Sequence, residues 1–311
     1  MYSMKSTSFL LSRIVTISCL GACSLAFASC GGGNGDGGTN GGASEGLSLK
    51  QLVIALKASE KPEEMLAEQA ALEEYLQEKL DRRVKVIVPT SSDSIGKSFR
   101  NGTLDVCYLN STDAARNVAQ ATAYVLLANL ENGKPHYKSI WLSLKGKDYG
   151  SVEELAGKPV AFAKRISASG FLIPAWDLSK RGLVGPDKAL TDFFSQTIYG
   201  TGGVSVVRKV LRGEVEAAAM SENENENLSD EWKAKLKVVQ EQGPVPTDVI
   251  CCRHTLSPAD REIIRNSLLA MNEDNPELRD KVFHGELAEV NPKEHLKITL
   301  EALKVEETLK Q

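Results

Sequence analysis

Apolar and polar positions follow two different periods along the chain from residue 51 onward. Residues 51–57 (QLVIALK) and 84–88 (VKVIV) are short apolar runs of the kind that form buried strands. Between them, residues 62–80 place apolar side chains at helical spacing, and Pro62 suits the first turn of a helix. Strands that alternate with helices predict parallel sheets flanked by helices, which is an α/β fold.

The alternation continues toward the C-terminus. A short helix is expected to end at Gly102, and a longer one to begin at Ser257, which can cap it, with Pro258 in its first turn. The tail after it is amphipathic and predicted to be helical. Further strands are predicted over residues 103–109, 121–127, 139–145, 159–163, 196–200, 215–220, 235–241 and 249–256.

The order of these elements predicts two lobes, because the strand at residues 249–256 is expected to return to the first strand–helix unit. The chain would then cross between the lobes near residues 145–149 and 244–249. Ligands of such folds bind where strand ends meet helix starts, so the expected ligand site is the cleft between the lobes. The predicted boundaries are 48–145 plus 249–311 for the first lobe and 146–248 for the second.

The sequence SASG at residues 167–170 places two hydroxyls and a glycine before an apolar helical run. The start of a helix has four unpaired N–H groups and a partial positive charge. Ser167, Ser169 and Gly170 could therefore form an anion site, with Lys164 and Arg165 adding charge from just upstream. The alternative is that one of the serines only caps the helix.

Composition narrows the class of partner. A chain of 311 residues with 42% hydrophobic and 25% charged residues can bury a core and is long enough for about two domains. The formal net charge is −4, there is no long basic run, and aromatic residues make up only 6% of the chain. A nucleic-acid partner is therefore not expected.

The N-terminus has the pattern of an export signal. Lys5 and Arg13 precede an uncharged, mostly apolar run at residues 14–29, which is shorter than the roughly 20 residues of a membrane span. The run ends in AFASC and resembles the lipobox of bacterial lipoproteins, so residues 1–29 are expected to be a lipoprotein signal peptide and Cys30 the lipidated residue. Cys23, after CLGA, is the alternative lipidation site, and an uncleaved membrane anchor is the alternative overall.

Residues 30–47 follow as a Gly-rich tether, in which residues 31–46 have no apolar side chain larger than that of alanine. This order predicts a lipid-anchored protein of the bacterial cell envelope, on the periplasmic or outer-surface side of the membrane.

The remaining cysteines and the histidines give no metal or catalytic pattern. Cys107 could form a disulfide with Cys251 or Cys252, but three buried thiols are the favoured interpretation. The four histidines are scattered, and no Cys-x-x-Cys, Gly-x-Ser-x-Gly or His-Glu-x-x-His motif occurs. The protein is not expected to be an enzyme, and no bound metal or cofactor is expected.

Five segments in order resemble the phosphate/phosphite/phosphonate-binding proteins of bacterial ABC importers. The resemblance implies a two-lobed periplasmic binding protein of type II-like architecture that hands a small anionic ligand to a membrane permease. A monomer is expected. The best match is the L-x-G-K-x-V-A-F strand entry followed by S-x-S-G. The segments are residues 71–88, 98–110, 151–183, 197–220 and 243–250.

The resemblance also implies a set of ligand-binding positions. Glu216 and Asp248 hold the places of two acids that can face an amino group on a phosphonate. The full set is Ser94, Asn110, Ser111, Thr112, Arg165, Ser167, Ala168, Ser169, Gly170, Thr201, Gly202, Glu216 and Asp248.

The chain departs from the family at several of these positions. Ala168 replaces a threonine, Ser94 replaces an aromatic residue, Ala114 stands about where a tyrosine falls, and Gly202 replaces a histidine. Lost donors around a charged ligand cost about 1.5–3 kcal/mol each. The departures therefore predict a larger ligand, compensation by Arg165, Ser111 and Thr112, or weak binding.

The expected function is solute capture for an ABC importer, by closure of the cleft around a phosphonate- or phosphate-like oxyanion. Two alternatives are a binding module that serves a sensor or receptor, and an exported structural lipoprotein with a degenerate pocket. Residues 200–203 (GTGG) predict a tight turn at the cleft, and residues 222–227 (ENENEN) predict a solvated loop.

Overall fold

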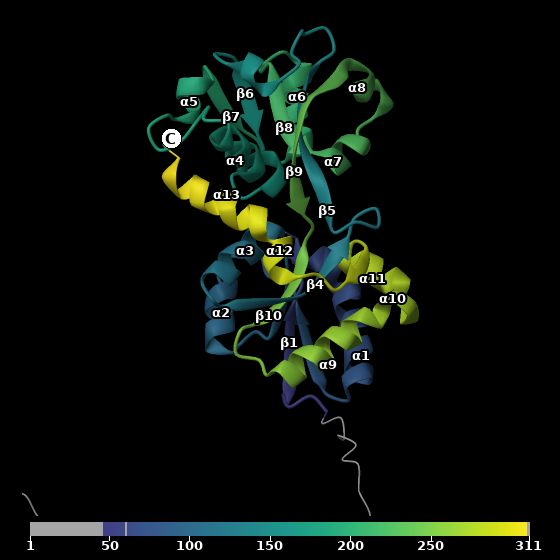
Figure 1. The fold of residues 1–311 in the computed structure, drawn as a ribbon. Coiled ribbons are helices and arrows are strands. Elements are labelled where there is room, and N and C mark those ends of the chain that lie inside the picture. The colour runs from purple at the N-terminus through teal and green to yellow at the C-terminus, as the bar shows by residue number, and fades with distance from the viewer. Residues whose placement is uncertain (1–45, 60, 310–311) are drawn as a thin grey trace, which may run out of the picture. The chain divides into compact units, whose positions relative to one another are not determined.

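The computed structural model describes residues 46–59 and 61–309, and the expected signal peptide, Cys30 and Cys23 lie outside them. Two sheets form the framework of this part of the chain (Figure 1). The first has the order β11 (Glu286–Ala288), β4 (Ala123–Leu130), β10 (Val249–Arg253), β3 (Val106–Leu109), β1 (Gln51–Ala55), β2 (Arg83–Ile87). The second has the order β7 (Gln196–Tyr199), β6 (Pro159–Phe162), β8 (Ala217–Ser221), β5 (His136–Leu144), β9 (Leu236–Pro246).

Both sheets are mixed rather than purely parallel. In the first, β1 pairs in parallel with β2 and β3, but β10 runs antiparallel to β3 and β4. In the second, β6 pairs in parallel with β7 and β8, but β5 runs antiparallel to β8 and β9. The antiparallel strands β5, β9 and β10 flank the connections between the sheets, which is why the parallel pattern breaks there.

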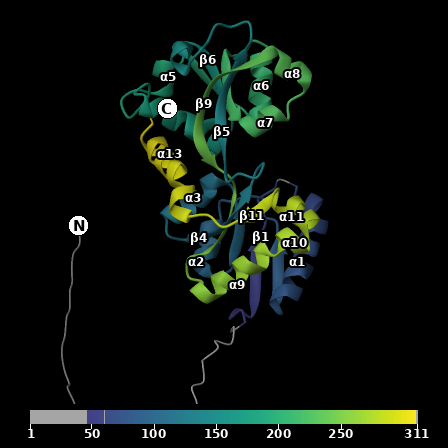
Figure 2. The same cartoon turned by 45° about the vertical axis from the view of Figure 1, so that its right-hand side comes forward.

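Helices cover the two sheets in separate groups (Figures 1 and 2). With the first sheet lie η1 (Pro62–Met65), α1 (Leu66–Leu80), α2 (Ile95–Asn101), α3 (Ser111–Ala119), α9 (Pro258–Leu269), α10 (Met271–Asp274) and α11 (Pro276–Phe283). With the second lie η2 (Val152–Leu155), η3 (Ala168–Leu172), α4 (Ile173–Lys180), α5 (Leu190–Phe193), α6 (Gly203–Leu211), α7 (Glu222–Glu226) and α8 (Asp230–Lys235). The C-terminal part adds α12 (Pro292–His295) and α13 (Lys297–Thr308).

Local sequence signals explain where several of these elements begin and end. The Ser257 hydroxyl accepts the N–H of Asp260, with Pro258 at the first position of α9, as predicted. Gly102 ends α2 in the left-handed conformation at φ 67°, which glycine adopts without strain. Each lobe has its own aromatic core: Tyr108 meets Phe283 edge-on in the first, and Trp141 meets Phe162 in the second.

Two predictions from the sequence were wrong: the sheet to which residues 139–145 belong, and the place of the first crossing between the lobes. We expected residues 139–145 to continue the first sheet, but β5 belongs to the second sheet, between β8 and β9. The first crossing therefore lies between β4 and β5, around residues 131–135, and not near residues 145–149. The second lies at Thr247 and Asp248, within the predicted interval of residues 244–249.

The C-terminal helix α13 is also not confined to the first lobe. Its Glu306 is 2.6 Å from Arg116 of α3, and its Glu301 is 3.9 Å from Lys180 of α4. Its apolar face, including Ala302 and Leu303, joins the core of the second lobe. Figure 1 shows α13 running from α12, beside the first sheet, to α4 of the second lobe.

Thr247 fastens the two crossing segments to each other. Its hydroxyl lies 2.6 Å from the carbonyl oxygen of Asn129 and 3.0 Å from that of Pro135, and its N–H donates to the same Pro135 oxygen at 3.1 Å. The Asn129 N–H donates to the carbonyl of Asp248. His295 of α12 completes the cluster, with Nε2 at 3.3 Å from the Thr247 carbonyl oxygen.

The three described cysteines are free thiols, as favoured from the sequence. Cys251 of β10 lies opposite Cys107 of β3, and Cys252 is its neighbour in the strand. All three are buried, and burial raises the pKa of each thiol. Among residues 46–59 and 61–309, no helix is long and apolar enough to cross a membrane.

The turn after β6 depends on a close backbone approach at Gly170. A Cβ atom at this position would lie 2.3 Å from the Cβ of Ala163 and 3.0 Å from the Ser167 hydroxyl oxygen. The Ala163 N–H also donates to the Gly170 carbonyl at 3.0 Å. The start of η3 is thereby held against the end of β6.

Gly170→Ala should destabilise the protein by about 1–3 kcal/mol, because the added methyl group has no room. Urea denaturation gives the free energy of unfolding. Gly146→Ala is the matched control, since a Cβ there meets open space in an exposed turn, and its effect should stay within about 0.5–1 kcal/mol. Equal stability of the two variants would contradict the steric argument.

Lowering the pH should reduce the free energy of unfolding, because His295 is protonated more readily in the unfolded chain. Burial, together with the nearby His136, lowers the pKa of His295 to about 4, against about 6.5 in an unfolded chain. Between these values the unfolded state binds the additional proton, so the free energy of unfolding falls as pH falls from 6.5 to 4, by about 3 kcal/mol in all.

His295→Gln should flatten this pH dependence, measured by urea denaturation at pH 7, 5.5 and 4. The control is His254→Gln at an exposed histidine, which should leave the wild-type profile in place. Parallel profiles for wild type and His295→Gln would show that another group carries the acid sensitivity.

Candidate functional site

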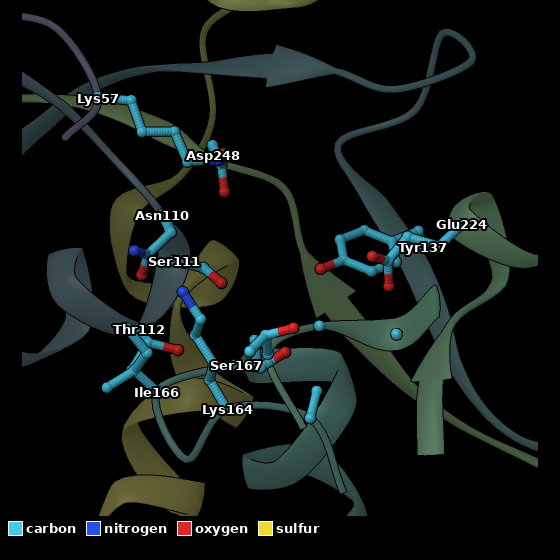
Figure 3. Close-up of a pocket in the computed structure, with 15 residues that line it drawn as sticks. Lys57, Asn110, Ser111, Thr112, Tyr137, Lys164, Ile166, Ser167, Glu224 and Asp248 are labelled. Atoms are coloured by element: carbon cyan, nitrogen blue, oxygen red, sulfur yellow. Dashed lines mark hydrogen bonds and ion pairs between the residues drawn. The ribbon is translucent and has the colours of Figure 1, made fainter. Parts of the chain in front are cut away.

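A cavity of about 280 Å³ lies where segments from both sheets meet, and Figure 3 shows it. Most of its polar residues follow the carboxyl ends of the parallel strands β1, β3, β6, β7 and β8. This is the edge at which open α/β sheets bind ligands, because helix starts gather there. The lining residues are Lys57, Asn110, Ser111, Thr112, Tyr137, Ala163, Lys164, Ile166, Ser167, Ala168, Thr201, Gly202, Gly203, Glu224 and Asp248.

The start of α3 supplies one wall. Asn110 caps the helix, with its side-chain oxygen accepting the N–H of Asp113 at 2.8 Å and its amide donating to the Asp113 carboxylate at 2.8 Å. Ser92 donates to the same carboxylate at 2.7 Å. These bonds fix Asn110 in a structural role and leave the first helical residues, Ser111 and Thr112, turned to the cavity (Figure 3).

Thr112 carries the clearest sign of a missing partner. Its side chain is fully buried, and Oγ1 has no hydrogen-bond partner among the described residues. A buried hydroxyl without a partner is costly, and native proteins satisfy nearly all of them. Because Thr112 lines the cavity, a bound ligand could supply that partner.

Ser167 is both a helix cap and a cavity residue. Its hydroxyl oxygen accepts the Gly170 N–H at 3.0 Å, and its carbonyl oxygen accepts the N–H groups of Phe171 and Leu172. Ser169 is buried and does not line the cavity, and its carbonyl oxygen instead accepts the Ser139 hydroxyl at 2.6 Å. Capping of the helix and a place in the candidate ligand site are therefore compatible roles for Ser167.

The turn at residues 200–203 forms a third wall, as the sequence predicted. The Ser205 hydroxyl oxygen accepts the N–H of Thr201 at 2.9 Å and of Gly202 at 3.2 Å, so these two donors are already used. Gly203, the first residue of α6, packs against the Glu224 carboxylate: a Cβ there would lie 2.3 Å from Glu224 Oε2.

Charges of both signs line the cavity. Lys57 forms an ion pair with Asp248 at one end, and Lys164 points toward Ser111 and Thr112 (Figure 3). Burial, and then the charge of Asp248, raise the pKa of Tyr137, so this phenol stays neutral and can donate a hydrogen bond. The same two causes, in the same order, raise the pKa of Glu131, which contacts Asn223 and does not line the cavity.

Eight of the thirteen residues expected at the site line this cavity, and five do not. Ser94 precedes α2, Arg165 stacks over the rings of Phe171 and Tyr199, and Ser169 and Gly170 lie inside the turn after β6. The eight are Asn110, Ser111, Thr112, Ser167, Ala168, Thr201, Gly202 and Asp248.

Glu216 lies outside the cavity, at the opposite end of β8. It precedes β8, where its carboxylate contacts Lys147 at 2.9 Å and the Tyr149 hydroxyl at 3.0 Å. The cavity lies beyond the other end of this five-residue strand, about 16 Å away at roughly 3.3 Å per residue. Glu224, just after β8, is the acid that lines the cavity.

Three polar residues of the cavity were not expected from the sequence. Lys57 follows β1 directly, and its place at a strand end was a usable signal. Tyr137 was missed because β5 had been assigned to the other sheet. Glu224 was placed in a solvated loop, but residues 222–226 form the helix α7, which turns Glu224 to the cavity.

The described residues contain no group of three or more His, Cys, Asp or Glu side chains that could hold a metal ion. Beside the carboxylates of Glu224 and Asp248, the cavity offers helix starts, hydroxyls and ammonium groups, which are groups that can bind an oxyanion.

Comparison with solved structures gives the same architecture. XAC2383 from Xanthomonas citri, solved with chloride, has a TM-score of 0.73 and 18% identity, covering 84% of this chain and 100% of that one. PhnD1 from Prochlorococcus marinus, in complex with methylphosphonate, has a TM-score of 0.62 and 16% identity, covering 83% and 98%. At these identities the similarity is one of fold, that of the two-lobed periplasmic binding proteins.

A family model described as "ABC transporter, phosphonate, periplasmic substrate-binding protein" matches residues 54–294. Such proteins bind solutes for a membrane permease and are not enzymes. The match spans most of the chain, and the chain therefore belongs to the family of periplasmic substrate-binding proteins of phosphonate ABC transporters.

Proposed function

We propose that this protein captures a small phosphonate- or phosphate-like oxyanion in the cavity between its sheets and presents it to an ABC permease. The observation that carries the proposal is the buried, unpartnered hydroxyl of Thr112 at the start of α3. An oxyanion accepts hydrogen bonds at several oxygens and can satisfy this hydroxyl together with neighbouring backbone N–H groups.

The surroundings of Thr112 support an anionic ligand. Helix α3 is nine residues long, so its first N–H groups carry the positive end of a helix dipole. Ser111 adds a hydroxyl from the same helix, and Ser167 and Lys164 approach from the second sheet (Figure 3). A ligand held there would touch both lobes at once.

Contact with both lobes gives a mechanism. The cavity has walls from both sheets, and the chain crosses between them around residues 131–135 and at residues 247–248. A ligand that touches both walls binds the closed arrangement more tightly and shifts the equilibrium toward it. The permease then recognises the closed form.

We propose the cellular setting from the sequence alone. Residues 1–29 act as a lipoprotein signal peptide, Cys30 (or Cys23) carries the lipid, and residues 30–47 form the tether. The protein works as a monomer at the cell envelope, held near its permease by the lipid. Mass spectrometry of the protein purified from membranes would identify the lipidated cysteine.

Thr112→Val should lower the affinity for methylphosphonate by about tenfold or more. A hydrogen bond to a charged group contributes about 1.5–3 kcal/mol, and 1.4 kcal/mol corresponds to a factor of ten. Isothermal titration calorimetry measures the change, after unfolding and refolding of residues 46–311 to remove any ligand carried through purification.

Thr299→Val is the matched control for this substitution. Thr299 of α13 is also fully buried with an unpartnered hydroxyl, but it lies outside the cavity, so its replacement should leave affinity unchanged. If neither methylphosphonate, phosphite, phosphate nor sulfate binds to the folded protein, the proposed function is wrong.

Closure predicts a change of size in solution. Small-angle X-ray scattering should show a smaller radius of gyration with saturating methylphosphonate than without ligand, since the lobes approach each other. Sodium chloride at equal ionic strength is the control. Saturable binding with no change in dimensions would contradict the closure mechanism.

A further inference from the structure

We propose that Lys57, by neutralising Asp248, makes the site select oxyanions that carry no amino group. The proposal rests on the proposed function and names its ligand class: phosphonates or phosphate-like anions whose remaining part is uncharged. It differs from the implication of the sequence resemblance, in which Asp248 and Glu216 were free to face a ligand ammonium group.

The ion pair of Lys57 and Asp248 is the first observation. Lys57 Nζ contacts Asp248 Oδ2, both residues line the cavity, and the Asp248 side chain is only 18% exposed. Lys57 Nζ also lies 5.9 Å from the centre of the Tyr108 ring, a cation–π contact that favours the same position. The one cavity carboxylate at the crossing between lobes is thus already neutralised by the chain itself.

The main chain fixes the point at which Lys57 leaves the sheet. Its neighbour Leu56 is fully buried and donates its N–H to the carbonyl oxygen of Ile87 at 2.9 Å, which extends the pairing of β1 with β2. The lysine therefore leaves the sheet edge at a fixed point beside Asp248. An incoming ammonium group would have to displace it, and would otherwise meet a like charge at close range.

The other acids near the site do not offer a free carboxylate at that end. Glu224 lies against Gly203 at the start of α6, where the helix dipole offsets its charge. Glu131 contacts Asn223 and does not line the cavity, and Glu216 is bound to Lys147 beyond the far end of β8.

An apolar group is available for the uncharged part of the ligand. Ile166 lines the cavity and is 49% exposed, so it offers apolar surface to a ligand there. An alkyl substituent on phosphorus would cover part of this surface and gain from the burial. Lys57 and Ile166 thus favour the same kind of ligand.

The experiment compares two ligands that differ by an aminomethyl group. Isothermal titration calorimetry of methylphosphonate and 2-aminoethylphosphonate gives an affinity ratio for each variant of the whole folded part, residues 46–311. Wild type should bind methylphosphonate at least tenfold more tightly. Lys57→Met keeps the apolar stem but removes the charge, freeing Asp248, and should shift the ratio at least tenfold toward 2-aminoethylphosphonate.

Two further variants serve as controls. Lys85→Met removes an exposed lysine of β2, outside the cavity, and should leave both affinities at wild-type values. Lys57→Arg keeps the charge beside Asp248 and should keep the preference for methylphosphonate. Thermal denaturation of each variant shows that it is folded.

The outcomes separate this inference from the proposed function. If wild type binds methylphosphonate but Lys57→Met lowers both affinities equally, Lys57 contacts the oxyanion itself and the selectivity proposal is wrong while the function stands. If wild type prefers 2-aminoethylphosphonate and loses that preference in Glu224→Gln, the ammonium group binds at Glu224 and the proposal is again wrong. If wild type binds neither ligand nor any other oxyanion tested, both proposals fail.

Discussion

The hydrogen bonds of Thr247 are the constraint on which the rest of the structure depends. This single residue bonds to Asn129 and Pro135, so it holds the two segments that pass between the sheets side by side. The next residue is Asp248, whose carboxylate meets Lys57 in the cavity. The link between the crossing segments and the charged end of the site therefore lies in neighbouring residues of one short segment.

The cavity is lined mostly by main chain and small side chains, so the departures from the family pattern leave much of its surface in place. Ala168 lacks a hydroxyl, but the turn around it is shaped by Gly170 against Ala163 and by the cap at Ser167. The start of α3 is likewise positioned by Asn110. Helix starts keep their donors whichever side chains surround them, so lost side chains change selectivity more readily than they abolish an anion site.

Local patterns predicted the elements well, because helical spacing, caps and strand runs depend on neighbours in sequence; the helix from Pro258 and the turn at residues 200–203 are examples. Membership of a sheet depends on partners far away in sequence, and β5 was misassigned for that reason. The same error hid Tyr137, and an acidic run that looked solvated hid Glu224. The ion pair of Lys57 with Asp248 joins residues 191 positions apart and could not be read from spacing.

Helix α13 gives the molecule a third connection between its lobes, beside the two crossing segments. Its ion pairs reach Arg116 on one side and Lys180 on the other, and its apolar face is buried in the second lobe. Because α13 contacts both lobes to the side of the two crossing segments, it should oppose twisting of one lobe against the other more than the two segments would alone. A closing motion that keeps these contacts is therefore expected to be a hinge rotation and not a twist.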